Sequence, residues 1–167
     1  MQTVAGYEIG LATESDLDGI LDLQEANLPH RGGTLSARLS REWLETALET
    51  MPVVVARRNG PLVGYLISSP FAAYAGVAVV EAMLRAYRGT PDAYVYGPIC
   101  VADGERGRGL GGAMFEALRA RLRGREGILC IRRDNAASLR AHARMGMQEV
   151  AEFTHGGAAF AVLSYVG

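Results

Sequence analysis

The chain has 167 residues, of which 49% are hydrophobic and 21% are charged. A chain of this length and composition buries a core of its own, so it is not a disordered protein and needs neither disulfides nor a metal for stability. Its 17 basic and 18 acidic side chains give a net charge of −1, which argues against bulk electrostatic binding to nucleic acid or to an anionic membrane. We expect a single domain over residues 1–167.

The two cysteines, Cys100 and Cys130, stand outside any C-x-x-C pattern and have no histidine at metal-ligand spacing. We therefore expect free buried thiols in a reducing compartment, and no metal site. The first residues lack the basic and apolar segments of a signal peptide, so the expected location is cytoplasmic. The uncharged segment 59–80 has the length of a membrane span. Its glycines, prolines and serines instead predict a buried strand, a turn and the start of a helix.

Apolar spacing, caps and turn residues predict alternating helices and strands along the chain. In chain order we expect a strand at 7–11, a helix at 15–27, a second helix that opens at Ser36 or Ser40 and reaches 48, strands at 53–56 and 62–68, a helix at 75–88, a strand at 93–101, a helix at 110–123, a strand at 128–131, a helix at 135–145, and strands at 148–153 and 158–166. Asn59-Gly60 predicts a hairpin. Pro98 lacks a backbone donor, which predicts an edge position or a bulge for its strand.

The segment Arg106-Gly107-Arg108-Gly109-Leu110-Gly111-Gly112 follows a predicted strand and opens a predicted helix. Free N–H groups at a helix N-terminus bind anions, and glycines let a phosphate approach the backbone closely. Arg106 and Arg108 add charged donors. The alternatives are a mobile loop, an RNA contact, or the dinucleotide fingerprint G-x-G-x-x-G spelled by Gly107, Gly109 and Gly112. Against the fingerprint, residues 102–106 separate the strand from the first glycine, and the remaining chain is too short for the second half of a dinucleotide fold.

A second motif lies on the next predicted helix, Asn135-Ala-Ala-Ser138-Leu-Arg-Ala-His142-Ala-Arg-Met-Gly146-Met147. Arg106-x-x-Gly109-x-Gly111, five residues after Val101, resembles the acyl-coenzyme A signature [Q/R]-x-x-G-x-[G/A] of the Gcn5-related N-acetyltransferase (GNAT) superfamily. The segment from Asn135 resembles that family's N-x-x-[A/S]-x-x-x-Y-x-x-x-G-F. The resemblance covers roughly residues 95–147. It implies an α/β (α+β) fold, with a mixed, mostly antiparallel central sheet that has splayed strands and is flanked by helices.

The chain departs from the family pattern in four places. His142 stands where tyrosine is usual, and Met147 where phenylalanine is usual. Cys130 takes the place of a glutamate that is catalytic in some members. The predicted helix within about 70–92 is an insertion between two strands that are usually joined directly.

The resemblance implies that an acetyl group passes from acetyl-CoA, as co-substrate, to a primary amine by direct attack. Backbone groups of Ile99, Cys100 and Val101 would align the pantetheine arm. The cofactor's diphosphate would be held by the loop residues Arg106, Gly107, Arg108, Gly109, Leu110, Gly111 and Gly112. Asn135 is expected as a helix cap, a cofactor ligand or both. Arg140 and Arg144 lie one turn apart and could reach the distal phosphate.

His142 is the candidate that protonates the departing thiolate, because the usual tyrosine is replaced by a side chain whose ordinary pKa is about 6.5. The alternative for His142 is a solvated helix residue that does not donate. The base that deprotonates the amine is left open among Glu25, His30, Tyr65, Tyr96 and a water relay. Arginines 119, 121, 123 and 125 are interpreted as a solvated helix face.

The acceptor would be a small-molecule amine, or an N-terminus or lysine of a protein. We expect its recognition in segments 27–36 and 70–92, with no nucleic-acid or membrane partner. A homodimer through the 75–88 helix or the last strands stays open. Two other functions remain alternatives: a non-catalytic acyl-CoA-binding sensor, motivated by the missing tyrosine and glutamate, and a dinucleotide-binding oxidoreductase.

Overall fold

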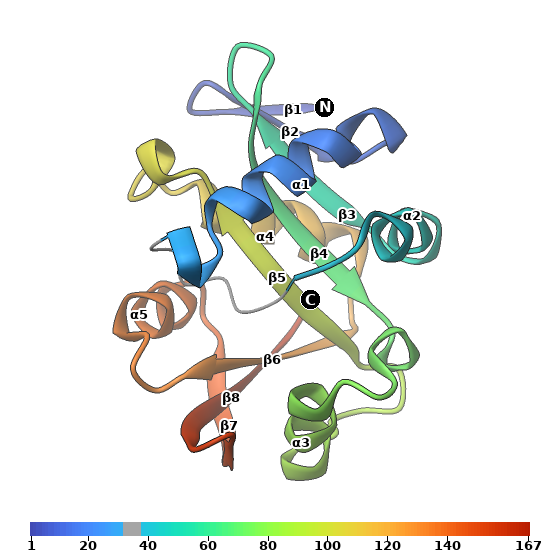
Figure 1. The fold of residues 1–167 in the computed structure, drawn as a ribbon, viewed down its shortest axis with the longest axis vertical. Helices are drawn as coiled ribbons and strands as arrows, with labels where there is room; N and C mark the ends of the chain where they lie inside the picture. Colours follow the sequence, from blue (N-terminus) through green and yellow to red (C-terminus); the bar gives the residue numbers. More distant parts are fainter. Residues whose placement is uncertain (32–37) are drawn as a thin grey trace. The chain divides into compact units, whose positions relative to one another are not determined.

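The computed structural model describes residues 1–31 and 38–167. The chain forms two compact units: the first comprises Met1–Ser69 and Gly97–Arg121, and the second comprises Pro70–Tyr96 and Leu122–Gly167. Strand β5 (Tyr94–Val101) contributes its first residues to the second unit and its last residues to the first. Figure 1 shows the course of the chain.

The first unit contains four further strands, which precede β5 in the order β1-β2-β3-β4-β5. Its strands and helices are β1 (Gln2–Val4), β2 (Tyr7–Leu11), α1 (Leu17–Ala26), α2 (Arg41–Thr50), β3 (Val53–Arg57), β4 (Leu62–Ser69) and α4 (Leu110–Arg121). The pairs β1–β2, β2–β3 and β3–β4 are antiparallel. Asn59 and Gly60 both have positive φ in the β3–β4 turn, so the hairpin prediction is confirmed.

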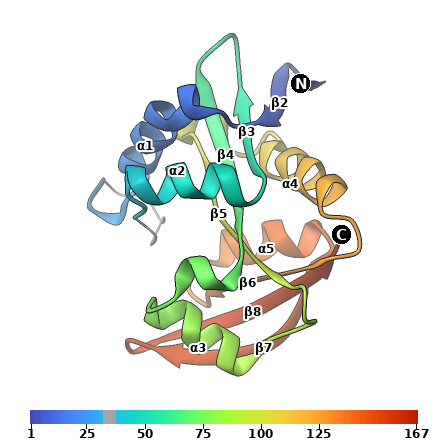
Figure 2. The same cartoon turned by 90° about the vertical axis from the view of Figure 1, so that its right-hand side faces the viewer.

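Helices pack on both faces of the first unit's strands, which explains the uninterrupted apolar run of β3. Helix α1 packs against β4 and α4 against β2, β3 and β4, and Figure 2 shows α1 and α4 on opposite sides of these strands. Leu17 and Ile20 of α1 join Val53 and Val55 of β3 in one core cluster. Gly64 permits the close approach of α4, because a Cβ there would lie 3.0 Å from the Met114 side chain.

The second unit arranges its strands in the order β5-β6-β8-β7, with β5–β6 parallel and the other pairs antiparallel. The elements after β5 are β6 (Glu126–Arg132), α5 (Ala136–Arg144), β7 (Gln148–His155) and β8 (Ala158–Val166). Helix α3 (Ala78–Ala86) lies before β5 and packs against β7. The predicted mixed, mostly antiparallel α/β fold is confirmed.

A buried carboxylate fixes the chain that follows α3. Glu126 is 5% exposed and accepts hydrogen bonds from the Tyr87 hydroxyl (2.9 Å), the Thr90 amide (2.9 Å) and the Ser164 hydroxyl (2.8 Å). Gly89 has φ +68° and lies so close that a Cβ there would overlap the carboxylate. Three donors satisfy the charge and compensate for its removal from water.

The structure corrects three details of the predicted elements. The short strand β1 was not expected, because three largely exposed residues carry no alternation. Helix α1 begins at Leu17 rather than at residue 15, because a 3₁₀ turn (Glu14–Asp16) precedes it and the Asp16 carboxylate accepts from the Thr13 amide at 2.8 Å. Of the two alternatives for the strand containing Pro98, the edge position is wrong, since β5 has neighbours on both sides, and the bulge stays a prediction. Its ladder with β6 is formed by Tyr94 and Val95, before Pro98.

Candidate functional site

The glycine-rich loop of the first unit has the backbone conformation that an anion site requires. After β5 the chain makes a 3₁₀ turn (Asp103–Glu105), and Gly107 and Gly109 then adopt φ +74° and +78°. A Cβ built on either glycine, or on Gly112, would meet no atom of the described residues within 4 Å. The Ala113 amide donates to Gly109 O at 3.1 Å and is the first to bond within the helical turn. The amides that precede Ala113 have no acceptor within α4. Their N–H groups are thus available to a ligand that approaches over the glycines.

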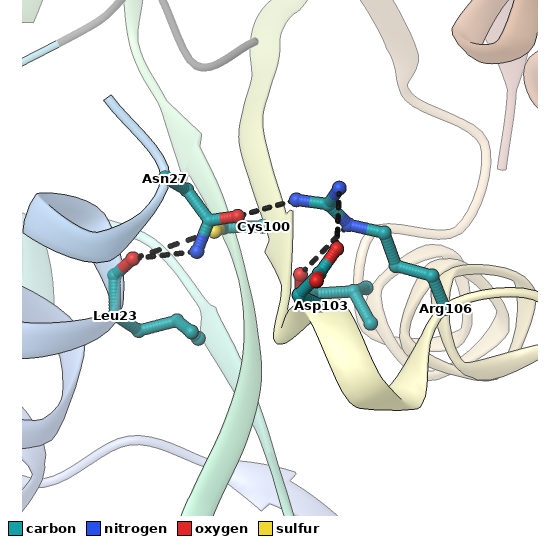
Figure 3. Close-up of polar contacts among 6 residues, drawn as sticks. Leu23, Asn27, Cys100, Asp103 and Arg106 are labelled. Atoms are coloured by element: carbon teal, nitrogen blue, oxygen red, sulfur yellow. Dashed lines mark hydrogen bonds and ion pairs between the residues drawn. The ribbon is translucent and has the colours of Figure 1, made fainter. Parts of the chain in front are cut away.

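The Arg106 side chain anchors the start of this loop, as Figure 3 shows. Its Nε donates to Val101 O at 3.2 Å, Nη1 to Asp103 at 3.3 Å, and Nη2 to the Asn27 side-chain oxygen. Asn27 is buried after the end of α1, and its own amide group donates to Leu23 O at 2.8 Å. The guanidinium therefore connects the loop to β5 and α1 through protein acceptors.

A second charged cluster lies on the other end of the 3₁₀ turn. Glu105 accepts from the Tyr7 hydroxyl at 2.5 Å and from Arg58 at 2.9 Å, and Arg108 Nε lies 3.8 Å from the same carboxylate. The hydrogen bond from Tyr7, with the Arg58 and Arg108 charges, lowers the pKa of Glu105. The Glu105 carboxylate thus balances the charges of Arg58 and Arg108 beside the glycine-rich loop. Neither Tyr7 nor Arg58 was predicted, because no local sequence pattern relates them to the loop.

The three β5 residues expected along the cofactor alternate in burial. Cys100 is buried, and its thiol lies 3.9 Å from Leu23 O, whereas Ile99 and Val101 are half-buried. Because side chains alternate along a strand, Ile99 and Val101 face away from the Cys100 side. Burial raises the pKa of the Cys100 thiol to about 11, which makes it an inert packing group.

His142 is buried in the second unit, so the solvated alternative is wrong: only 4% of the residue is exposed. Its Nδ1 lies 2.8 Å from Ser138 O on the same helix, and its Nε2 lies 3.1 Å from the Tyr96 hydroxyl. The two rings meet edge to face, with centroids 5.5 Å apart. Burial lowers the pKa of His142, so the side chain is more often neutral at pH 7 than its ordinary pKa implies.

Other candidates on α5 lie at its start and on its surface. Asn135 caps the helix, since its side-chain oxygen accepts from the Ser138 amide at 3.2 Å. The capping role is confirmed, and a role as cofactor ligand stays a prediction. Arg140 and Arg144 are exposed. In β6, burial raises the pKa of Cys130 to about 11, which disfavours a thiolate nucleophile.

The candidates for the base are distributed over both units. Glu25 pairs with Arg38 at 3.0 Å, Tyr65 is 1% exposed, and Tyr96 is 4% exposed. Residues 32–36 of the expected recognition segment, and the side chain of His30, lie outside the described residues. No group of three metal-ligating side chains occurs in residues 1–31 and 38–167. Within the same ranges, no helix has the length and hydropathy to cross a membrane.

Solved structures with a similar fold include three acetyltransferases that are remote in sequence. The ribosomal-protein-alanine N-acetyltransferase of Brucella melitensis is 26% identical, with a TM-score of 0.68 over 95% of this chain and 99% of that one. An N-acetyltransferase from Staphylococcus aureus Mu50 is 17% identical, with a TM-score of 0.70 over 97% and 99%. A phosphinothricin acetyltransferase from Sinorhizobium meliloti, solved with acetyl-CoA, is 20% identical, with a TM-score of 0.69 over 96% and 88%.

No curated protein sequence matches this chain. The family model described as "Acetyltransferase (GNAT) family" matches residues 17–147, which include the glycine-rich loop, β5 and α5. The match extends well beyond the two motifs and covers most of the chain, so this protein is a member of the GNAT acetyltransferase family.

Proposed function

We propose that the protein transfers an acetyl group from acetyl-CoA to a primary amine by direct attack. The observation that carries the proposal is the loop between β5 and α4, where two glycines with positive φ expose backbone N–H groups at a helix N-terminus. Such a site binds a diphosphate without any specific side chain. The structure of the Sinorhizobium enzyme with acetyl-CoA supports the choice of ligand.

Different residues would bind the diphosphate, align the pantetheine arm and transfer the proton. Amides from Gly107 to Gly112 hold the diphosphate, and Arg108 adds a charged donor while Arg106 holds the loop in place. Backbone groups of Ile99, Cys100 and Val101 align the pantetheine arm, and a free amide on this strand stabilises the oxyanion of the tetrahedral intermediate. Asn135 contributes a ligand in addition to its cap, and His142 takes part in protonating the departing thiolate. The acceptor is a small amine, or an N-terminus or lysine of a protein.

A second candidate function is an acyl-CoA sensor without turnover. The observation that favours it is that His142 Nδ1 lies 2.8 Å from Ser138 O of its own helix, an acceptor that engages this nitrogen within the protein. A sensor would retain the loop amides and would not need a proton donor.

Calorimetric titration with acetyl-CoA, followed by a thiol-release assay with a panel of primary amines, separates these functions. Binding together with release for at least one amine supports the transferase. Tight binding without release for any amine supports the sensor. Preference for NADH over acetyl-CoA would overturn both and favour the dinucleotide alternative.

A further inference from the structure

Three contacts of the ring nitrogens indicate where the protons of His142 lie. Nδ1 lies 2.8 Å from Ser138 O and, more distantly, 3.3 Å from Ser138 Oγ, and Nε2 lies 3.1 Å from the Tyr96 hydroxyl. Ser138 O can only accept, so Nδ1 of His142 carries a hydrogen and donates it. In the neutral ring Nε2 is then a bare acceptor, and the hydrogen of the 3.1 Å bond belongs to the Tyr96 hydroxyl. A tyrosine at position 142 would supply a hydroxyl donor, whereas the neutral His142 has no N–H left for a substrate. The hydroxyl next to its Nε2 is that of Tyr96, from β5.

We propose that Tyr96 and His142 act as one proton-transfer pair, in which the Tyr96 hydroxyl exchanges protons with the substrates and His142 Nε2 stores the proton between two steps. This inference rests on the proposed acetyl transfer. It assigns the base that the sequence leaves open, and it makes His142 a partner of Tyr96 rather than the direct donor.

The position of Tyr96 supports this role. It lies three residues before Ile99, where the proposed alignment of the pantetheine arm begins, so the covalent chain itself keeps its backbone near the start of that segment. Its ring is held edge-on by Tyr165, with centroids 5.8 Å apart, and by His142 on another side. A side chain restrained on two sides keeps its hydroxyl oriented towards Nε2.

The proton steps balance as follows. The amine arrives as an ammonium; one N–H bond breaks and its proton binds Tyr96 Oη, while the Tyr96 proton moves to His142 Nε2. The imidazolium then donates through Nδ1 to Ser138 O and through Nε2 to Tyr96. The amine lone pair forms the C–N bond, and the C–S bond breaks with its electron pair on sulfur. The thiolate takes the Tyr96 proton as Nε2 returns its proton to Tyr96, and the surplus proton of the new amide nitrogen leaves to solvent.

Burial disfavours the charged form of either group, so the imidazolium of the relay is a transient species and not the resting state. It lowers the pKa of His142 and raises the pKa of Tyr96, so the resting pair holds a neutral imidazole and a neutral phenol. Among the described residues, the Tyr165 ring packs against Tyr96, the Tyr165 and Tyr94 hydroxyls bond each other, and the Arg125 guanidinium lies over the Tyr94 ring. Protons therefore move along the bond between the pair in concert, without a tyrosinate.

The kinetic test compares Tyr96→Phe, His142→Gln and the double variant, using thiol release with an amine that the wild-type protein acetylates. Tyr94→Phe is the matched control, because it removes a buried hydroxyl from the same strand that bonds Tyr165 and not His142. We expect each single variant to lower kcat by about tenfold or more, with the acetyl-CoA Kd changed less than about threefold. The double variant should be no slower than the slower single variant, since the two residues act as a unit.

A Tyr96→Phe variant that keeps kcat within about twofold would overturn the pair, as would losses that multiply in the double variant or an equal loss in Tyr94→Phe. If the wild-type protein neither binds acetyl-CoA nor acetylates any amine, it is the proposed function that fails. The two failures are therefore distinguishable.

A measurement without substrate tests the pair directly. The chain has three histidines, so ¹⁵N ring resonances can be assigned to His142 by their loss in His142→Gln. We expect the neutral tautomer with hydrogen on Nδ1, and a change in the Nε2 resonance in Tyr96→Phe but not in Tyr94→Phe. A tautomer with hydrogen on Nε2, or an Nε2 resonance unaffected by Tyr96→Phe, would overturn the assignment.

Discussion

The bond between Asn27 and Arg106 provides a quantitative test of how the cofactor loop is held. The two residues are 79 positions apart, yet the guanidinium donates to the buried Asn27 side chain. A hydrogen bond with one charged partner contributes about 1.5–3 kcal/mol when it is buried. The Arg106 side chain is 46% exposed, so solvent screening reduces the expected coupling to about 1–2 kcal/mol.

Urea unfolding of the wild-type protein, Asn27→Ala, Arg106→Ala and the double variant measures this coupling as a thermodynamic cycle. Asn27→Ala also removes the donor to Leu23 O, so we expect it to lower the free energy of unfolding by about 2–3 kcal/mol. The control is the pair of Arg106 with Asp103, whose side chain is 94% exposed and should couple by less than about 0.5 kcal/mol. A coupling for Asn27 as small as that for Asp103 would refute the inference that Arg106 anchors the loop through α1.

Three further predictions address the loop, the acidic cluster and the thiols. Gly109→Ala forces a side chain onto φ +78°, which costs about 1–2 kcal/mol, and should weaken acetyl-CoA binding about tenfold or more in calorimetry. Gly157→Ala, at the same φ in the β7–β8 turn, should lose similar stability and keep its affinity; equal affinity losses would contradict the loop's role. The Tyr7 hydrogen bond, with Arg58 and Arg108, lowers the pKa of Glu105, so its stabilising effect is present above about pH 4.5 and is lost as the pH falls through the folded-state pKa. Urea unfolding between about pH 3 and 6 should therefore show a steeper loss of stability for the wild-type protein than for Glu105→Gln, and parallel curves would contradict this assignment. Burial raises the pKa of Cys100 and of Cys130 to about 11, so both thiols of the native protein should react with iodoacetamide at pH 8 about a hundredfold more slowly than in urea. Rapid labelling of the native protein would show that one of these thiols is accessible as a thiolate.

Local patterns predicted most of the fold because the signals lie within a few residues of one another. Asn59-Gly60 places two positive φ values between two apolar runs, and Gly146, with φ +89°, follows the end of α5 as expected for a helix stop. The same holds for the glycine-rich loop, whose motif is continuous in sequence. Strand β1 was not predicted, because its three residues are too few to show an alternation of apolar and polar side chains.

The contacts that define the site could not be predicted, since they depend on residues far apart in the chain. His142 lies between arginines at 140 and 144, a context that favours a solvated face. It is nevertheless buried, and its ring contacts Tyr96, which lies 46 positions earlier. Arg106 resembles a phosphate ligand in sequence, whereas its guanidinium bonds to protein acceptors that include Asn27. Periodicity assigns a side chain to a face of its helix but does not identify the partner on that face.

The carboxylate of Glu126 constrains how the α3 segment can change during evolution. Its bonds reach the Thr90 amide 36 positions earlier, and Gly89 leaves the room that the carboxylate occupies. A larger residue at 89 would displace the carboxylate. A neutral apolar residue at 126 would remove the acceptor of the Tyr87 hydroxyl, the Thr90 amide and the buried Ser164 hydroxyl. Grafting of this helical segment into a related acetyltransferase would therefore have to transfer Gly89 and Glu126 together, although they belong to different elements.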